Sequence, residues 1–311
     1  MCSTRGGNRP ANSRPILFTP FAITVVSLVA LFIFLNERRS SEHSDAILGI
    51  TKPKEEKKSF PRESPSVPTP RTGWSTRNIE QLSMWMECQR KLRWEKEKWV
   101  GRQGLKLLLL GDSITEHLTG ASVGVVSQRF DEVKAAFDSS FEDDTTLALG
   151  ISGDQTQHLL WRLGEGGELE GLEPEFVHIL IGTNNLGAGF APIGAFEGIK
   201  AVVDLVRETV PPSTRIILEE IFPREFRNPS QEQEKVAKVN EMIREYWKEE
   251  DGTGGGITLA QCGRAFVTDE TKGFNEGAWR VKIPLMPDKL HPSASGVKLW
   301  MDCIKAQMRN I

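Results

Sequence analysis

The feature that most constrains the fold is an alternation of short apolar runs with longer amphipathic segments, which extends from residue 105 to residue 309. Apolar residues at helical spacing mark four helices, namely 155–163, 192–210, 231–250 and 294–309. Runs of strand length and apolar character are 105–110, 146–150, 176–181, 215–221 and, more weakly, 256–262. This alternation predicts an α/β domain, a three-layer sandwich in which helices cover both faces of a central five-stranded parallel sheet.

Residues that directly follow the strands are the first candidates for a functional site, because such sheets bind ligands beyond the carboxyl ends of their strands. Ser113 follows the first strand, within the sequence GDSIT, at a predicted tight turn into a helix. A serine in this position is by itself a common helix N-cap. Gly153 follows the second strand in LGISGD, and Asn184 follows the third in GTNN. A glycine N–H and an asparagine amide can both donate to a developing oxyanion, although each residue is also common in ordinary turns.

A fourth short motif, DKLHP, precedes the last predicted helix and contains Asp288 and His291. One loop could therefore supply a histidine base together with an aspartate that fixes its tautomer and stabilises the imidazolium. Taken alone, this fragment is equally consistent with a surface aspartate and a capping histidine. The fragment becomes significant only together with the motifs that follow the first three strands.

Together, the four motifs in this order and spacing resemble the blocks of the SGNH (GDSL-type) hydrolase family, over a region from about residue 106 to the end of the chain. LGISGDQTQHLLWRL and the later ILIGTNN are similar in particular to the catalytic subunits of platelet-activating-factor acetylhydrolases. The resemblance implies a flavodoxin-like SGNH fold for residues 74–311. It also implies that Ser113 is the nucleophile, His291 the general base and acid, and Asp288 its orienting partner.

By the same resemblance, the oxyanion hole consists of the backbone N–H groups of Ser113 and Gly153 and the side-chain amide of Asn184. Gly153 is chosen over Gly150 because the family's glycine lies just before an aspartate or asparagine. Asn184 is chosen over Asn185 because it directly follows Gly-Thr.

The implied function is that of a serine esterase, which hydrolyses a short-chain ester, in particular an acetyl ester, of a lipid or a carbohydrate through an acyl-enzyme on Ser113. A longer-chain lipase or thioesterase is an alternative, and so is a catalytically silent module that binds acylated ligands. Trp279, Leu285 and Met286, with Phe274, lie in the segment that leads to Asp288. They are candidates for the wall of the substrate pocket, or for a covering loop packed for stability.

Other polar residues have ordinary structural explanations. His117, His158 and His178 are predicted to be structural, and Asp154 is predicted to cap a helix. No metal-ligand spacing and no phosphate-cradling loop occurs in the sequence, so neither a metal nor a cofactor is expected. The net charge of −3 provides no basic field for nucleic acid. The scattered cysteines allow one disulfide among the last three, with the pair left open, and they are Cys2, Cys88, Cys262 and Cys303.

The N-terminal part differs in character from the hydrolase region. Residues 16–35 form an uncharged run of 20 residues, which as a helix rising about 1.5 Å per residue crosses the roughly 30 Å hydrocarbon layer. We interpret this run as a signal-anchor helix after a short tail, 1–15, with a cleaved signal peptide or an organelle-targeting segment as alternatives. Residues 36–73, rich in Pro, Ser, Lys and Glu, are predicted to be a disordered linker. The hydrolase domain would then be lumenal or extracellular, and the resemblance adds a homodimer as a candidate assembly.

Overall fold

A five-stranded parallel sheet forms the centre of the computed structural model, which describes residues 64–71, 78–141, 145–225, 229–248, 256–268 and 279–310. The strand order is β4-β1-β5-β6-β7. The strands are β1 (Leu107–Gly111), β4 (Thr146–Gly150), β5 (Phe176–Leu180), β6 (Arg215–Glu219) and β7 (Ile257–Ala260). The predicted α/β domain with a five-stranded parallel sheet is confirmed, and β1 lies at the point where the strand order reverses, the usual ligand position in such sheets.

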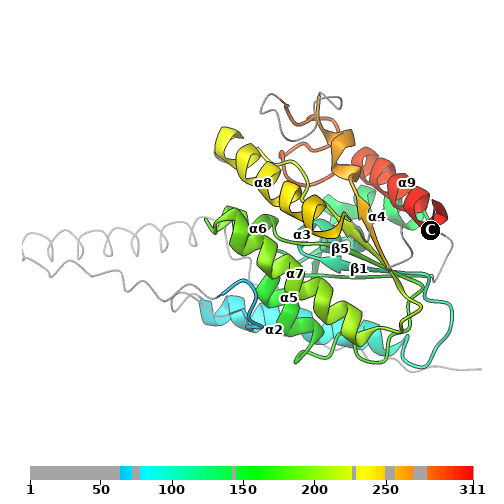
Figure 1. Ribbon diagram of the computed structural model, residues 1–311. Coiled ribbons are helices and arrows are strands. Elements are labelled where there is room, and N and C mark those ends of the chain that lie inside the picture. Colours follow the sequence, from blue (N-terminus) through cyan, green and yellow to red (C-terminus); the bar gives the residue numbers. More distant parts are fainter. Residues whose placement is uncertain are drawn as a thin grey trace, which may run out of the picture. The chain divides into compact units, whose positions relative to one another are not determined.

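Helices cover both faces of this sheet (Figure 1). On one face α4 (Asp131–Asp138) packs against α9 (Ala294–Asn310). On the other face α7 (Pro192–Thr209) lies between α5 (Thr156–Leu163) and α8 (Pro229–Trp247). The helix α2 (Asn78–Glu97) precedes β1 and contacts α5 through the rings of Trp85 and Trp161, whose centroids are 5.5 Å apart. The shorter elements are α3 (Ser113–Glu116), α6 (Thr183–Gly187), β2 (Ala121–Ser122), β3 (Val125–Val126), and the 3-10 helices His117–Thr119, Gln128–Phe130 and Cys262–Phe266.

Two glycines at paired strand ends make room for the turn that follows β1. All five residues of β1 are buried, as expected for a strand covered on both faces, and Gly111 at its end is paired with Gly150 at the end of β4. A Cβ atom on Gly111 would clash with Oγ1 of Thr115, and one on Gly150 would lie 2.5 Å from the backbone nitrogen of Glu116. Any larger side chain would therefore displace α3 and the serine at its start.

A segment of the predicted linker packs on the hydrolase domain. We call Ser64–Arg71 the strap. The Thr69 N–H donates to the carbonyl oxygen of Gln157 at 3.1 Å, and the hydroxyl of Thr156 donates to the carbonyl oxygen of Pro65 at 2.8 Å. These contacts hold the strap against the start of α5, so the packed part of the chain extends to the N-terminal side of residue 74.

The remaining N-terminal predictions concern residues that the structure does not describe. The tail 1–15, the anchor 16–35 and most of the linker 36–73 lie outside the described residues. Among the helices in the described ranges, none combines the length and the apolar character that a membrane crossing requires.

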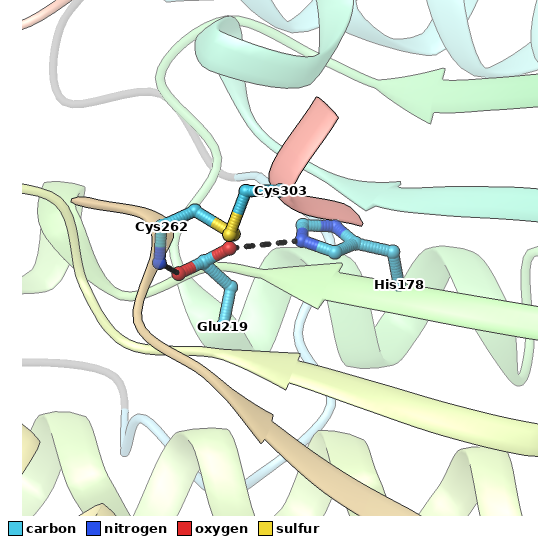
Figure 2. The surroundings of a disulfide bond; sticks show 4 residues. All are labelled: His178, Glu219, Cys262 and Cys303. Carbon is cyan, nitrogen blue, oxygen red and sulfur yellow. Dashed lines mark hydrogen bonds and ion pairs between the residues drawn. A yellow bond between two sulfur atoms is a disulfide. The ribbon is translucent and has the colours of Figure 1, made fainter. Parts of the chain in front are cut away.

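A disulfide bond joins the end of the sheet to the last helix (Figure 2). Cys262, which follows β7, is bonded to Cys303 on α9, across a sequence separation of 41 residues. This selects the pair that the sequence left open, and Cys88 is a free, buried thiol. Beside the bond, the carboxylate of Glu219 accepts the Cys262 N–H at 2.8 Å and faces Nε2 of His178 at 3.4 Å. The disulfide thereby fixes the position of the C-terminal helix relative to the sheet.

Candidate active site

Three side chains form a continuous hydrogen-bonded chain at the carboxyl edge of the sheet. Oγ of Ser113 lies 2.9 Å from Nε2 of His291, and Nδ1 of His291 lies 2.7 Å from Oδ2 of Asp288. Ser113 begins α3 directly after β1, whereas the other two residues occupy the loop before α9. The structure thus brings together the three residues that the sequence proposed as a triad, in the order nucleophile, base and orienting acid.

The helix-capping role expected of a lone serine at such a boundary belongs to its neighbour. Oδ1 of Asp112 accepts the backbone N–H of Ile114 at 3.0 Å and so caps α3. The hydroxyl of Ser113 is directed to His291 instead and is only slightly exposed. This arrangement leaves the serine oxygen available as a nucleophile.

The loop that carries the acid and the base is shaped around the carboxylate of Asp288. Burial raises the pKa of this carboxyl, but hydrogen bonds from the ring and backbone of His291 and from the Leu290 N–H outweigh it and hold the pKa well below its usual range. Lys289, which directly follows Asp288, has a φ of 62°. This left-handed conformation costs about 1–2 kcal/mol for a residue with a side chain. Asp288 therefore stays ionised at neutral pH and can stabilise an imidazolium at His291.

Two further predicted site residues follow the neighbouring strands β4 and β5. Gly153 has a φ of 85°, and its N–H donates no hydrogen bond to any residue within the described part of the chain. Nδ2 of Asn184 donates to the carbonyl oxygen of Asp154 at 2.9 Å and faces Oδ2 of Asp112 at 3.3 Å, which places it beside the serine turn. Asn185 is fully buried and binds the backbone of Thr156, so it cannot face a substrate. The roles of Gly153 and Asn184 as oxyanion donors remain predictions.

Glu116 holds the turn that carries Gly153, a role that sequence reasoning missed. Its buried carboxylate accepts the backbone N–H and the hydroxyl of Ser152, both at 2.6 Å. It also accepts the N–H groups of Val123 and Gly124 at 2.9 and 2.6 Å. Because a buried charge is costly unless such donors satisfy it, this carboxylate ties α3, the β2–β3 hairpin and the β4 turn together.

The comparison with protein families agrees with this geometry. The family model described as GDSL-like lipase/acylhydrolase matches residues 109–299, more than half of the chain, and the match spans the segments with Ser113, Gly153, Asn184, Asp288 and His291. The chain belongs to this GDSL-like hydrolase family.

Two named human proteins are similar in sequence to about half of this chain. It is 37% identical over 150 residues to human platelet-activating factor acetylhydrolase IB subunit alpha1, a match that covers 48% of this chain and 58% of the relative. The human alpha2 subunit is 31% identical over 150 residues, with the same coverage. The chain thus spans less than two thirds of the length of these relatives. Among solved structures, a GDSL-like lipase from Bacteroides thetaiotaomicron has a TM-score of 0.55 at 19% identity, covering 71% of this chain and 97% of its own, which supports the fold alone.

Of the residues proposed for the pocket wall of the GDSL hydrolase, two are packed in the core. Met286 is fully buried and Trp279 is 2% exposed, so they offer almost no surface to a ligand. The Trp279 carbonyl oxygen also accepts Nε2 of Gln233 at 2.9 Å, which fixes the start of the segment from within. Leu285 is partly buried, and Phe274 lies outside the described residues. Their apolar character therefore reflects packing beneath the loop of Asp288.

The predicted N-cap role of Asp154 is wrong, because Gln155 caps α5. The Gln155 N–H donates to Nδ1 of His158 at 3.1 Å, in agreement with the prediction that His158 is structural. Asp154 is fully buried, where it accepts Nε1 of Trp85 at 2.7 Å and pairs with Nε of Arg162 at 2.7 Å. Asp154 thus ties α2, through Trp85, to α5, through Arg162.

Asp112 places a carboxyl group close to the predicted oxyanion donors. Burial raises its pKa to about 7, while the N–H of Ile114 and the nearby charge of His291 act in the opposite direction. A carboxyl with this pKa is protonated in a large fraction of molecules at neutral pH. The repulsion that a developing oxyanion would feel beside Asn184 is reduced accordingly.

His117, predicted to be only structural, packs directly on His291, the predicted general base. Its ring centroid lies 4.6 Å from that of His291 and 4.0 Å from that of Phe130, on which it stacks. Burial lowers the pKa of His117 to about 3, and the nearby charges of His291 and Arg129 lower it further, whereas Asp288 opposes the shift. The imidazole of His117 is therefore neutral in the folded state and supports the ring of His291.

We expect His117 to make the stability of the protein dependent on pH. The unfolded chain protonates this side chain near pH 6.5, whereas the folded chain does so only near pH 3, so the unfolded state binds more protons between these values. The free energy of unfolding should fall with falling pH below about 6.5, with up to about 1.4 kcal/mol per pH unit from this group. Denaturant unfolding of the His117→Phe variant should show a shallower fall between pH 6.5 and 5. Parallel curves for the two proteins would contradict the assignment.

Substitution of the two adjacent asparagines should have different effects, one on the rate of catalysis and the other on stability. Loss of one oxyanion donor typically costs about 10²–10³ in turnover, so Asn184→Ala should lower kcat by this factor with little change in melting temperature. Asn185→Ala should instead remove the partner of the buried Thr156 N–H, at a cost of about 1–3 kcal/mol of stability. Ester hydrolysis rates and thermal unfolding of both variants test this. An unchanged kcat for Asn184→Ala would remove this residue from the oxyanion hole.

A metal centre has no support in the described residues, since no group of three or more His, Cys, Asp or Glu there is placed to hold an ion.

Proposed function

We propose that this chain is a serine esterase that hydrolyses a short-chain ester, in particular an acetyl ester, of a lipid or carbohydrate through an acyl-enzyme on Ser113. The observation that carries the proposal is the hydrogen-bonded chain Ser113–His291–Asp288. Membership of the GDSL-like lipase/acylhydrolase family supports the same class of reaction.

In the proposed mechanism, Nε2 of His291 removes the proton of Ser113 as Oγ attacks the ester carbonyl. The N–H groups of Ser113 and Gly153 and the amide of Asn184 donate to the resulting oxyanion, for which the Asn184 amide exchanges its long contact with Asp112. His291 then gives its proton to the leaving alcohol. Water attacks the acyl-enzyme with the same assistance, which releases the acid and restores the serine.

The size of the acyl group follows from similarity to named acetylhydrolases, which is an analogy at the level of the family. A longer-chain lipase or thioesterase would use the same residues, and rates against acyl length distinguish it. A silent binding module would keep the fold without the reaction. The direct contacts of the triad favour the enzyme over the binding module.

For location, we propose that residues 16–35 anchor the chain and that the hydrolase domain faces the lumen or the exterior. The Cys262–Cys303 disulfide supports this side, because such bonds persist mainly in oxidising compartments. In isolated microsomes, a C-terminal epitope should resist added protease until detergent opens the vesicles. Digestion without detergent would place the domain on the cytosolic side.

A homodimer, by analogy with related subunits, is tested by the mass of the purified protein in solution.

The direct test of the activity uses nitrophenyl esters from acetyl to decanoyl with the full-length protein in mild detergent. We expect a specificity constant that falls with chain length, together with labelling of Ser113 by a serine-reactive phosphonate. Rising rates with chain length would favour the lipase, and a folded protein with neither turnover nor labelling would favour the binding module.

A further inference from the structure

The strap brings an arginine to the turn that carries the predicted oxyanion glycine. Nη1 of Arg71 donates to the carbonyl oxygen of Ser152 at 2.9 Å. A Cβ atom built on Gly153 would lie 2.9 Å from Nη2, 3.1 Å from Nη1 and 3.3 Å from Cζ of the same arginine. The guanidinium therefore packs directly against Gly153, and the absence of a side chain at this position makes room for it.

This position of Arg71 is fixed by the strap rather than by a flexible tether. Besides the hydrogen bonds to Thr156 and Gln157 in α5, the strap packs so closely on α7 that a Cβ on Gly198 would lie 2.8 Å from the carbonyl oxygen of Pro65. The side chain of Arg71 is partly buried. A guanidinium held in this way retains fewer conformations to lose when it binds a ligand.

The charge of Arg71 has no acidic partner among the residues that the structure describes. Within the described parts of the chain, no carboxylate lies within ion-pair distance of its guanidinium. The buried carboxylate of Glu116, which binds the same turn, accepts hydrogen bonds from the backbone and hydroxyl of Ser152 and from the backbone of Val123 and Gly124. One hydrogen bond to a carbonyl oxygen leaves most of the five guanidinium N–H donors unused. Within the described residues, a guanidinium without a carboxylate partner therefore lies beside the predicted oxyanion glycine.

We propose that Arg71 is a specificity residue that binds an anionic group of the substrate, such as a phosphate close to the ester bond. This inference rests on the proposed esterase function and names the class of ester. A guanidinium presents pairs of N–H groups in one plane, which match the oxygens of phosphate. Because Arg71 contacts Gly153, the anionic group must lie within a few bonds of the carbonyl that the glycine would serve.

Two other roles for Arg71 make different predictions. If the hydrogen bond to Ser152 only ties down the strap, loss of the guanidinium lowers the melting temperature and affects all esters alike. If Arg71 only stabilises the oxyanion, the charge matters equally for a neutral and an anionic ester. Only a binding role makes the effect depend on the charge of the substrate.

The experiment compares two acetate esters of similar size with the full-length protein, 2-acetoxyethyl phosphate and the neutral 2-methoxyethyl acetate, and follows release of acetate. We expect the wild type to prefer the phosphate ester. Arg71→Gln should lower the ratio of the two kcat/KM values by about tenfold or more, through KM, and Arg71→Lys should lower it less. Arg90→Gln, which removes an exposed arginine on α2, is the matched charge control and should leave the ratio unchanged. An unchanged ratio in Arg71→Gln, with or without a general loss of rate, overturns the proposal.

A binding measurement separates this inference from the proposed function. Inorganic phosphate should bind the Ser113→Ala variant in calorimetry, and addition of Arg71→Gln should weaken this binding about tenfold or more. If the wild type cleaves neither ester while phosphate binding still depends on Arg71, the esterase proposal fails and the anion site stands. Binding that does not depend on Arg71 overturns the anion site even where esters are cleaved.

Discussion

Ser113→Ala should lower kcat for ester hydrolysis by about 10⁴–10⁶-fold, because the variant retains donors around the carbonyl but has no nucleophile. The hydroxyl lies 2.9 Å from Nε2 of His291, so the two side chains act as one unit. His291→Ala should therefore cause a loss of similar size, and the double variant should be little worse than either single one. Steady-state rates with nitrophenyl acetate, at protein concentrations high enough to detect the residual turnover, provide the measurement.

Two controls make this prediction specific. Ser139→Ala removes a hydroxyl that donates to the Ala136 carbonyl oxygen at the end of α4, and it should leave kcat unchanged. Ser113→Ala should keep the melting temperature of the wild type, because its hydroxyl bonds a partly exposed histidine. If the losses in Ser113→Ala and His291→Ala multiplied in the double variant, the two residues would act independently and the triad would be refuted.

Reduction of the Cys262–Cys303 bond should destabilise the protein by about 4 kcal/mol, the chain-entropy value for a closed loop of 41 residues. For a domain of this size, such a loss lowers the melting temperature by roughly 8–16 °C. Thermal unfolding with and without a thiol reductant measures the shift. The Cys262→Ala, Cys303→Ala double variant should melt near the reduced wild type and should no longer respond to the reductant.

Cys88 provides the control for this experiment. Its thiol is buried and unpaired, and burial together with the charge of Glu116 raises its pKa far above the usual range, so it reacts slowly with disulfides. Cys88→Ala should retain the full response to reductant. A wild-type protein whose melting temperature ignores complete reduction of the bond, verified by thiol labelling, would show that the disulfide adds nothing to stability.

The sheet and the triad could be predicted because both are encoded in local patterns. The leucines of β1 form an apolar run that only a strand buried on both faces explains, and the motif of Ser113 follows it directly. The motif of Asp288 and His291 was recognisable in the same way. The strand boundaries differ from the prediction by at most two residues, as expected where an apolar run continues beyond the hydrogen-bonded ladder.

The strap could not be predicted, because its composition and its packing point in opposite directions. The prolines and serines of 64–71 indicate a linker that buries little surface, whereas the hydrogen bonds to Gln157 and Thr156 come from a helix about 90 residues further along the chain. No local pattern encodes such contacts. Arg71 was missed for the same reason, since its significance depends entirely on its neighbour Gly153.

Burial bears on the two interpretations that the sequence left open for the loop before Asp288, a pocket wall or a covering loop packed for stability. An apolar residue beside a catalytic aspartate has two uses, as a pocket wall and as packing beneath the loop, and the sequence does not separate them. In the structure Met286 and Trp279 serve the second use. His117 is the opposite case, a residue predicted to be only structural that contacts a predicted site residue. Nothing in the local sequence indicated that its ring would contact that of His291.

In the proposed mechanism, the distance along the chain between Ser113 and His291 determines when the protein becomes reactive during synthesis. The two residues are 178 positions apart, and the base lies just before the last helix, which the Cys262–Cys303 bond then fastens. A growing polypeptide therefore contains the proposed nucleophile long before it contains the histidine proposed to activate it. Chains that are cut short or released early would be inert towards esters, so hydrolysis begins only after the C-terminal helix has emerged and docked.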